Sequence, residues 1–154
     1  MFCFFGGGLA VFSYEFIFRK KIKRKRIRRP HYKALGVSLV TLILIWFFFK
    51  PNLIYPLIIS SFMGAICLWV DRKDLIKHSI IGGLSFMLIH VLLAAILFTF
   101  LTPNLLNSFF NFNNISGIVF LNVPIEEYFF AFAFGLLWAP IYEYFYGKID
   151  VNIK

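Results

Sequence analysis

The chain has 154 residues, of which 60% are apolar and 21% aromatic, so it is too hydrophobic to hide its apolar surface inside one soluble core. Its net charge of +9 arises from sixteen Lys and Arg against seven Asp and Glu, and nine of the basic residues lie in residues 19–29. Because that cluster stands between two apolar stretches, we interpret it as a cytoplasmic loop that contacts anionic lipids, and we expect no nucleic acid partner.

Five apolar stretches predict an all-α fold, a polytopic membrane helix bundle with about five transmembrane helices. We expect a single membrane domain over residues 1–154, multi-pass in the cell membrane, with the lipid bilayer as its partner. In the first stretch the positive charges follow the apolar run, which reverses the order of a cleavable signal peptide, so we expect this helix to be retained. The predicted spans are residues 2–18, 34–49, 53–70, 79–101 and 115–146.

The basic residues between the spans predict that the N-terminus lies outside and the C-terminus is cytoplasmic. Ten of them lie in the basic cytoplasmic loop 19–33, three in 71–77 and two in 148–154, whereas Lys50 alone lies in an external loop. Clustered Lys and Arg resist translocation, so this distribution of fifteen against one determines the predicted orientation. The second and third spans are joined by only residues 50–52, which predicts an antiparallel helical hairpin.

The last apolar stretch, residues 115–146, is too long for one straight span, because a helix of this length would measure about 48 Å against a hydrocarbon core of about 30 Å. Asn122-Val123-Pro124 predicts an interruption, since Asn can cap a helix, the residue before Pro avoids helical angles and Pro suits a first turn. We expect a short entering segment over 115–121 and a main helix over 124–146. The Asn-rich segment 102–114 before it predicts an external loop.

Glu126 and Glu127 follow directly after this interruption and are the candidate catalytic residues. A desolvated carboxyl holds its proton and can act as a general acid, while the second of two adjacent carboxyls can accept a proton. The alternative is that both lie in water at the outer interface, where a helix N-terminus favours negative charge. Because adjacent helical residues point about 100° apart, we expect only one of them to face the bundle interior.

Aromatic residues continue the same predicted helix, and Phe129, Phe130 and Phe134 are candidates for substrate binding. Their ring faces would form a wall that stabilises a cationic intermediate; the alternative is that they face lipid while the interleaved small residues permit close helix packing. His90 is a further candidate for substrate binding, because a titratable residue in mid-span is a functional hypothesis by default. Its alternative is a neutral His bonded to a backbone carbonyl or to a neighbouring helix.

Two further patterns concern the cysteines and the N-terminal part of the chain. Cys3 and Cys67 lie in apolar stretches without metal-ligand spacing, so we expect neither a disulfide nor a metal site. A weak internal echo is also typical of membrane proteins built from repeats, and a true repeat would make the chain an N-terminal truncation. The echo aligns Gly7, Tyr14, Glu15 and Phe18 with Gly135, Tyr142, Glu143 and Tyr146.

Residues 112–147 contain Asn113, Ser116-Gly117-Ile118 and Pro124-Ile125-Glu126-Glu127 leading into aromatic residues. In these features the segment resembles the lycopene cyclase domain of small bacterial, archaeal and fungal membrane proteins, whose P-x-E-E motif opens a transmembrane helix and supplies essential acids. The resemblance implies a carotenoid biosynthesis enzyme of the isomerase type, which closes a ring at the end group of a linear carotene by redox-neutral acid catalysis. It implies an apolar isoprenoid substrate and no bound flavin or other cofactor. It also implies that one of the two glutamates is the acid and that the other is its partner or the base.

Complete cyclases of this kind bring two such domains together, fused or as a heterodimer, whereas this chain has one P-x-E-E motif. The resemblance therefore implies a homodimer, a second cyclase-domain subunit or missing N-terminal residues. The predicted function is that of a lycopene cyclase-type enzyme or subunit. The alternative is a non-catalytic membrane or partner-assembly protein that has retained the domain.

Overall fold

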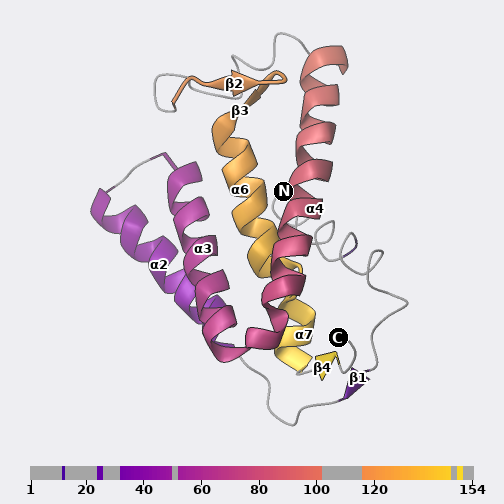
Figure 1. Ribbon diagram of the computed structural model, residues 1–154. Helices are drawn as coiled ribbons and strands as arrows, with labels where there is room; N and C mark the ends of the chain where they lie inside the picture. Colours follow the sequence, from indigo (N-terminus) through magenta and orange to yellow (C-terminus); the bar gives the residue numbers. More distant parts are fainter. Residues whose placement is uncertain are drawn as a thin grey trace.

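The computed structural model describes residues 12, 24–25, 32–49, 52–101, 116–146 and 149–150, and helices make up most of them (Figure 1). The α-helices are α2 (Lys33–Phe49), α3 (Ile54–Asp71), α4 (Ile76–Ile96), α6 (Ile125–Trp138) and α7 (Ile141–Tyr146). A 3-10 turn over Lys73–Leu75 precedes α4, and a π-helical turn over Leu97–Leu101 extends it. Two antiparallel pairs of short strands complete the described part: β1 (Arg24–Lys25) with β4 (Ile149–Asp150), and β2 (Val119–Phe120) with β3 (Val123–Pro124).

The predicted helices agree with the observed ones along the middle of the chain. Helices α2, α3 and α4 with its π-helical extension coincide with the second, third and fourth apolar stretches. The segments Ile54–Asp71 and Lys73–Thr99 are each long and apolar enough to cross a bilayer, and α2 is a shorter apolar helix. The predicted first span, apart from Phe12, and the predicted loop 102–114 lie outside the described residues.

Helix α6 packs against both α3 and α4, and α2 packs against α3 as the hairpin prediction requires (Figure 1). The chain reverses between α3 and α4 at Arg72, whose backbone leaves helical angles with φ −140° and ψ 80°. The Arg72 side chain forms a bidentate ion pair with Asp74, at 2.9 Å from Nε to Oδ1 and 2.6 Å from Nη2 to Oδ2. Charge-assisted, bidentate hydrogen bonds between a guanidinium and a carboxylate are strong, and this pair therefore stabilises the reversal between α3 and α4.

The crossing of α4 and α6 depends on glycine. A Cβ atom placed on Gly135 would lie 2.8 Å from the Cα of Gly83 and 3.0 Å from the Cβ of Phe86, so no larger residue fits at 135 without a shift of one helix. Next to it, the Ser79 hydroxyl donates a hydrogen bond to the backbone carbonyl of Leu136. Small residues and an interhelical hydrogen bond are the usual means by which apolar helices approach closely.

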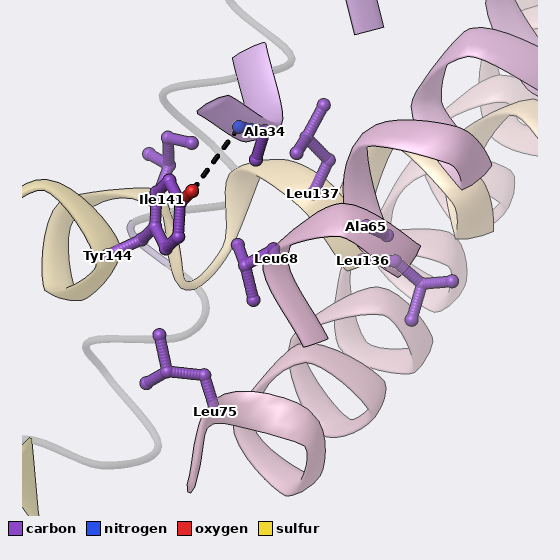
Figure 2. Packing of buried hydrophobic residues seen from close by; sticks show 8 residues of the cluster. All are labelled: Ala34, Ala65, Leu68, Leu75, Leu136, Leu137, Ile141 and Tyr144. Carbon is purple, nitrogen blue, oxygen red and sulfur yellow. Dashed lines mark hydrogen bonds between the residues drawn. The ribbon is translucent and has the colours of Figure 1, made fainter. Parts of the chain in front are cut away.

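The main hydrophobic core lies at the end of the bundle where α2 begins and α3 ends (Figure 2). Tyr144 is fully buried there, and its hydroxyl accepts a hydrogen bond from the backbone N–H of Ala34 and donates one to Asp71 Oδ2 at 2.9 Å. One side chain therefore connects α7 to the start of α2 and the end of α3. The core residues are Ala34, Ala65, Leu68, Leu75, Leu136, Leu137, Ile141 and Tyr144.

The same end of the bundle gathers the segments that were predicted to be cytoplasmic. Strand β1, from the basic loop 19–33, pairs with β4, from the C-terminal segment (Figure 1). The ammonium of Lys33 lies 4.0 Å from the Asp71 carboxylate, which places the end of the basic loop beside the α3–α4 reversal. This arrangement agrees with the alternation of loops on which the predicted orientation depends, while the orientation itself and the number of five spans stay predictions.

The last apolar stretch differs in part from the prediction. The interruption at Asn122-Val123-Pro124 is confirmed, since α6 begins at Ile125 and Pro124 caps it with extended angles. The segment before it includes a β-hairpin whose two-residue turn, Leu121 and Asn122, has positive φ at both positions, as a tight hairpin turn requires. The prediction of a single main helix over 124–146 was wrong. Helix α6 ends at Trp138, and α7 begins at Ile141. Pro140 lies between them and has no backbone N–H to donate to a helical hydrogen bond.

Candidate acid–base site

The β2–β3 hairpin fixes the start of α6 at the end of the bundle opposite the basic segments (Figure 1). The backbone N–H of Ile125 donates to the carbonyl of Ile118 at 3.0 Å, and the Tyr128 hydroxyl donates to the carbonyl of Phe120 at 2.8 Å. The Asn122 amide also donates to the Thr99 hydroxyl at 3.2 Å, which connects the hairpin to the extension of α4. These hydrogen bonds connect the hairpin with the start of α6 and with the extension of α4.

Glu126 is buried in that first turn, with 3% of its surface exposed. Its Oε1 atom accepts hydrogen bonds from the backbone N–H of Ser116 at 2.6 Å and from the Tyr55 hydroxyl at 3.3 Å. Its Oε2 atom is buried and has no hydrogen-bond partner among the described residues. A carboxyl with one satisfied and one unsatisfied oxygen is costly in a protein interior, and such a group calls for an explanation.

Glu127 turns to the other neighbouring helix. Its Oε2 atom lies 3.0 Å from Nε2 of His90 on α4, and both side chains are largely buried, with 18% and 27% of their surfaces exposed. The contact is a hydrogen bond between an imidazole and a carboxyl, and the imidazole tautomer decides which of the two groups donates. A hydrogen-bonded carboxyl–imidazole pair of this kind can accept a proton and pass it on.

Aromatic rings surround His90 and continue along α6. The ring of His90 lies 5.7 Å from that of Phe86 and 6.3 Å from that of Phe130, measured between centroids. Phe130, Phe134 and Trp138 follow one another at 5.5 Å per step, four residues apart on the same face of α6. The rings therefore form a continuous row that begins at the Glu127–His90 pair and runs toward the core.

Most of the predicted site residues lie together in the structure, but one of them does not. Both glutamates face the interior, one toward α3 and one toward α4, so the expectation that only one would do so was wrong; α6 lies between two helices and presents buried faces to both. Phe130 and Phe134 join His90 in the aromatic row. Phe129 does not: it is 55% exposed and points away from the site.

Three residues of the site were not named as candidates from the sequence. Tyr55 lies near the start of α3 and meets Glu126 across 71 positions of sequence, and Phe86 completes the row from α4. Ser116 contributes a backbone N–H, which residue type does not reveal. One indication was present in the sequence: Tyr55 lies near the start of the third predicted span, and Glu126 lies near the start of the predicted main helix, at the same end of the bundle.

Glu143 lies on α7, at the opposite end of the bundle from Glu126 and Glu127. It too is buried, with 4% exposed. Among the described residues, no three His, Cys, Asp or Glu side chains gather in a group that could hold a metal ion. The described site offers two carboxyls, one imidazole and one phenol for chemistry.

Comparison with known families places this site in context. The family model described as lycopene cyclase matches residues 52–145, which is more than half of the chain. The chain belongs to the lycopene cyclase family. No curated protein and no solved structure matches it. The lycopene cyclase match covers α3, α4 and α6 together, and so includes Tyr55, His90 and both glutamates, while α2 precedes it.

Proposed function

We propose that this chain is a membrane-embedded carotenoid cyclase, or one subunit of such an enzyme, which closes a ring at the end group of a linear carotene by acid–base catalysis. The observation that carries the proposal is the buried Glu126 carboxyl, with its unpartnered Oε2, next in sequence to the Glu127–His90 pair. One group is arranged to give a proton and the other to take one. Membership of the lycopene cyclase family supports the same reaction.

In the proposed mechanism, Glu126 acts as the acid. In its neutral form the Oε1 atom is the carbonyl oxygen, because it accepts both hydrogen bonds, and the proton is on Oε2. This proton is transferred to the terminal double bond of the carotene, which leaves a tertiary cation. The cation closes on the neighbouring double bond and forms the carbon–carbon bond of the ring.

The Glu127–His90 pair then removes a proton from a carbon next to the new cation, which forms the ring double bond. One proton enters and one leaves, so the product is an isomer of the substrate and no electron is gained or lost. Charge stabilisation between the two transfers comes from the aromatic row, since the faces of Phe86, Phe130 and Phe134 carry negative quadrupole density. The described residues thus supply each step without a redox partner.

The proposed site lies within a membrane bundle. Large apolar side chains remain exposed along the helices, including Leu88 at 66% and Leu92 at 62% on α4, and Phe47 at 72% on α2. A core helix of a soluble protein buries such residues, whereas lipid accepts them. The proposal is therefore a multi-pass protein with its basic segments in the cytoplasm, which takes its carotene from the bilayer.

We also propose that the active enzyme contains two cyclase domains, as a homodimer or with a second cyclase-domain subunit. The chain has one Pro-x-Glu-Glu sequence, at Pro124 to Glu127, and hence one acid–base site of the kind described. This part of the proposal is tested by expressing the chain alone and together with a candidate second subunit.

The deciding experiment is expression in bacteria that accumulate lycopene, followed by chromatography of the extracted carotenoids. Cyclic products are expected from the wild-type chain, alone or with its partner. Glu126→Gln and Glu127→Gln should each abolish them, because an amide has the shape of the carboxyl but neither gives nor takes the proton. A general acid or base contributes about 10²- to 10⁴-fold to rate, so residual product should fall to the detection limit.

Glu143→Gln is the matched control, since it removes a buried carboxyl at the opposite end of the bundle. Activity per amount of folded membrane protein should stay near wild type in this variant. Unchanged lycopene with verified membrane expression, in the presence of any candidate partner, would instead favour a non-catalytic membrane or assembly protein. A loss of protein level in the Glu126 and Glu127 variants, with full activity of the remainder, would make these residues structural.

A further inference from the structure

Tyr55 is the residue of α3 that reaches the proposed acid. Its hydroxyl donates to Oε1 of Glu126 at 3.3 Å, and the two residues come from helices that pack side by side. Tyr55 is 36% exposed, so its ring stands at the edge of the bundle while its hydroxyl points inward to the carboxyl. The contact is made with Glu126 and not with the Glu127–His90 pair, which faces α4.

Two donors meet on the same carboxyl oxygen. The backbone N–H of Ser116 lies 2.6 Å from Oε1 and can only donate, and the Tyr55 O–H donates to the same atom. A proton on Oε1 would collide with the N–H of Ser116. The proton of the neutral acid is therefore confined to Oε2, the oxygen that has no partner among the described residues.

We infer that Tyr55 is a positioning residue, which holds the Glu126 carboxyl so that Oε2 is the proton-donating oxygen and which stabilises the carboxylate as the proton leaves. The inference rests on the proposed function, because it assigns a role within the same reaction. As Glu126 loses its proton, negative charge develops on the carboxyl, and a hydrogen bond to a charged group is stronger than one to a neutral group. The Tyr55 bond thus strengthens in the transition state and acts on kcat rather than on substrate binding.

The first test compares Tyr55→Phe with Tyr128→Phe, a matched control. Both variants lose one phenolic hydroxyl at the same end of the bundle, but the Tyr128 hydroxyl bonds the carbonyl of Phe120 and not a carboxyl. Loss of a hydrogen bond to a charged group corresponds to a fall in kcat of about 10- to 100-fold in Tyr55→Phe. KM should stay unchanged, and Tyr128→Phe should keep wild-type kcat.

The pH dependence gives a readout that a merely structural role would not move. With one donor fewer, the charged form of Glu126 is less stable, so the acid form persists to higher pH and the alkaline limit of kcat/KM should move upward in Tyr55→Phe. Replacement of Tyr55 by 3-fluorotyrosine keeps the ring and the hydroxyl, and its more acidic O–H is a stronger donor, so the same limit should move downward. This second variant keeps the test valid if Tyr55→Phe fails to fold.

Infrared spectroscopy tests the geometry without turnover. The carbonyl stretch of protonated Glu126, identified by its absence in Glu126→Gln, should shift to higher frequency in Tyr55→Phe and stay in place in Tyr128→Phe. If kcat, the pH limit and this band are all unchanged in Tyr55→Phe while Glu126→Gln is inactive, the inference is wrong and the proposed function stands. If the wild-type chain makes no cyclic product with any partner, the proposed function fails, and the infrared comparison still decides whether Tyr55 holds the carboxyl.

Discussion

Replacement of Gly135 by Ala tests whether the site depends on the close crossing of α4 and α6. The added Cβ would lie 2.8 Å from the Cα of Gly83, 3.0 Å from the Cβ of Phe86 and 3.3 Å from the carbonyl oxygen of Gly82. Two of these atoms belong to backbone and cannot rotate away, so α4 and α6 must separate. The added methyl therefore acts on the whole crossing and not on one side chain.

The expected cost follows from two opposing effects. Overpacking of a filled interior costs about 1–3 kcal/mol. Alanine is also a better helix former than glycine by about 0.8–1.0 kcal/mol, which offsets part of that cost. Gly36→Ala on α2 is the matched control, because a Cβ there meets no atom within 4 Å and gains the helix preference alone. The two variants should therefore differ by about 1–3 kcal/mol in the free energy of unfolding.

Thermal unfolding of the detergent-solubilised protein, followed by loss of the monodisperse peak in size-exclusion chromatography, measures this difference. At about 2–4 °C per kcal/mol for a chain of this size, Gly135→Ala should melt several degrees below Gly36→Ala. Cyclisation should fall in Gly135→Ala as well, because separation of the helices lengthens the 3.0 Å contact between His90 and Glu127. Equal melting temperatures for the two variants would refute the reasoning.

Three further outcomes are expected. His90→Gln keeps a polar side chain beside Glu127 but removes the titratable partner. The initial rate of cyclisation should therefore fall about 10- to 100-fold, which corresponds to the loss of one charge-assisted hydrogen bond. An unchanged rate would exclude the pair as the base. Tyr144→Phe leaves a buried N–H and a carboxylate each without this partner, so the melting temperature should drop by the equivalent of about 1–3 kcal/mol, with activity per folded molecule retained. In a background without native cysteines, Asn122→Cys should react with an impermeant maleimide on intact cells and Lys73→Cys only after permeabilisation; the reverse pattern would invert the proposed orientation.

The start of α6 was predictable because the rules that determine it are local. A residue before Pro avoids helical angles, so Asn122-Val123-Pro124 indicated a break, and the two following glutamates stood out as charges in an apolar stretch. The hairpin before the break was not predictable in the same way. Leu121 adopts φ 52°, a conformation that its residue type disfavours, because the pairing of β2 with β3 holds it there. The break between α6 and α7 could have been predicted from Pro140, but the apolar pattern continues through this residue and gives no sign of a break.

The partners of the site residues depend on long-range packing and could not be deduced from periodicity. His90 and Glu127 are 37 residues apart, and Tyr55 and Glu126 are 71 apart, so each contact exists only because α6 lies between α3 and α4. The aromatic pattern was ambiguous for a related reason. Phe129 and Phe130 are adjacent and chemically identical, yet one points outward and the other joins the row beside His90. The sequence indicated the candidate residues, and helix packing determined which of them meet.

Buried polar side chains occur at both ends of the bundle, and the hydrogen bonds of Glu126 bear on the proposed function. At the basic end, Tyr144 bonds both the Ala34 backbone and Asp71, which connects three helices. At the other end, Glu126 has two donors on one oxygen and no partner among the described residues on the other. A Gln here could accept both bonds through its oxygen, but it would place an amide NH2 where the carboxyl has Oε2 and would carry no transferable proton. Under the proposed mechanism, the proton of the neutral acid lies on Oε2, the oxygen that is free of the Ser116 and Tyr55 bonds, and is therefore the one available to a substrate.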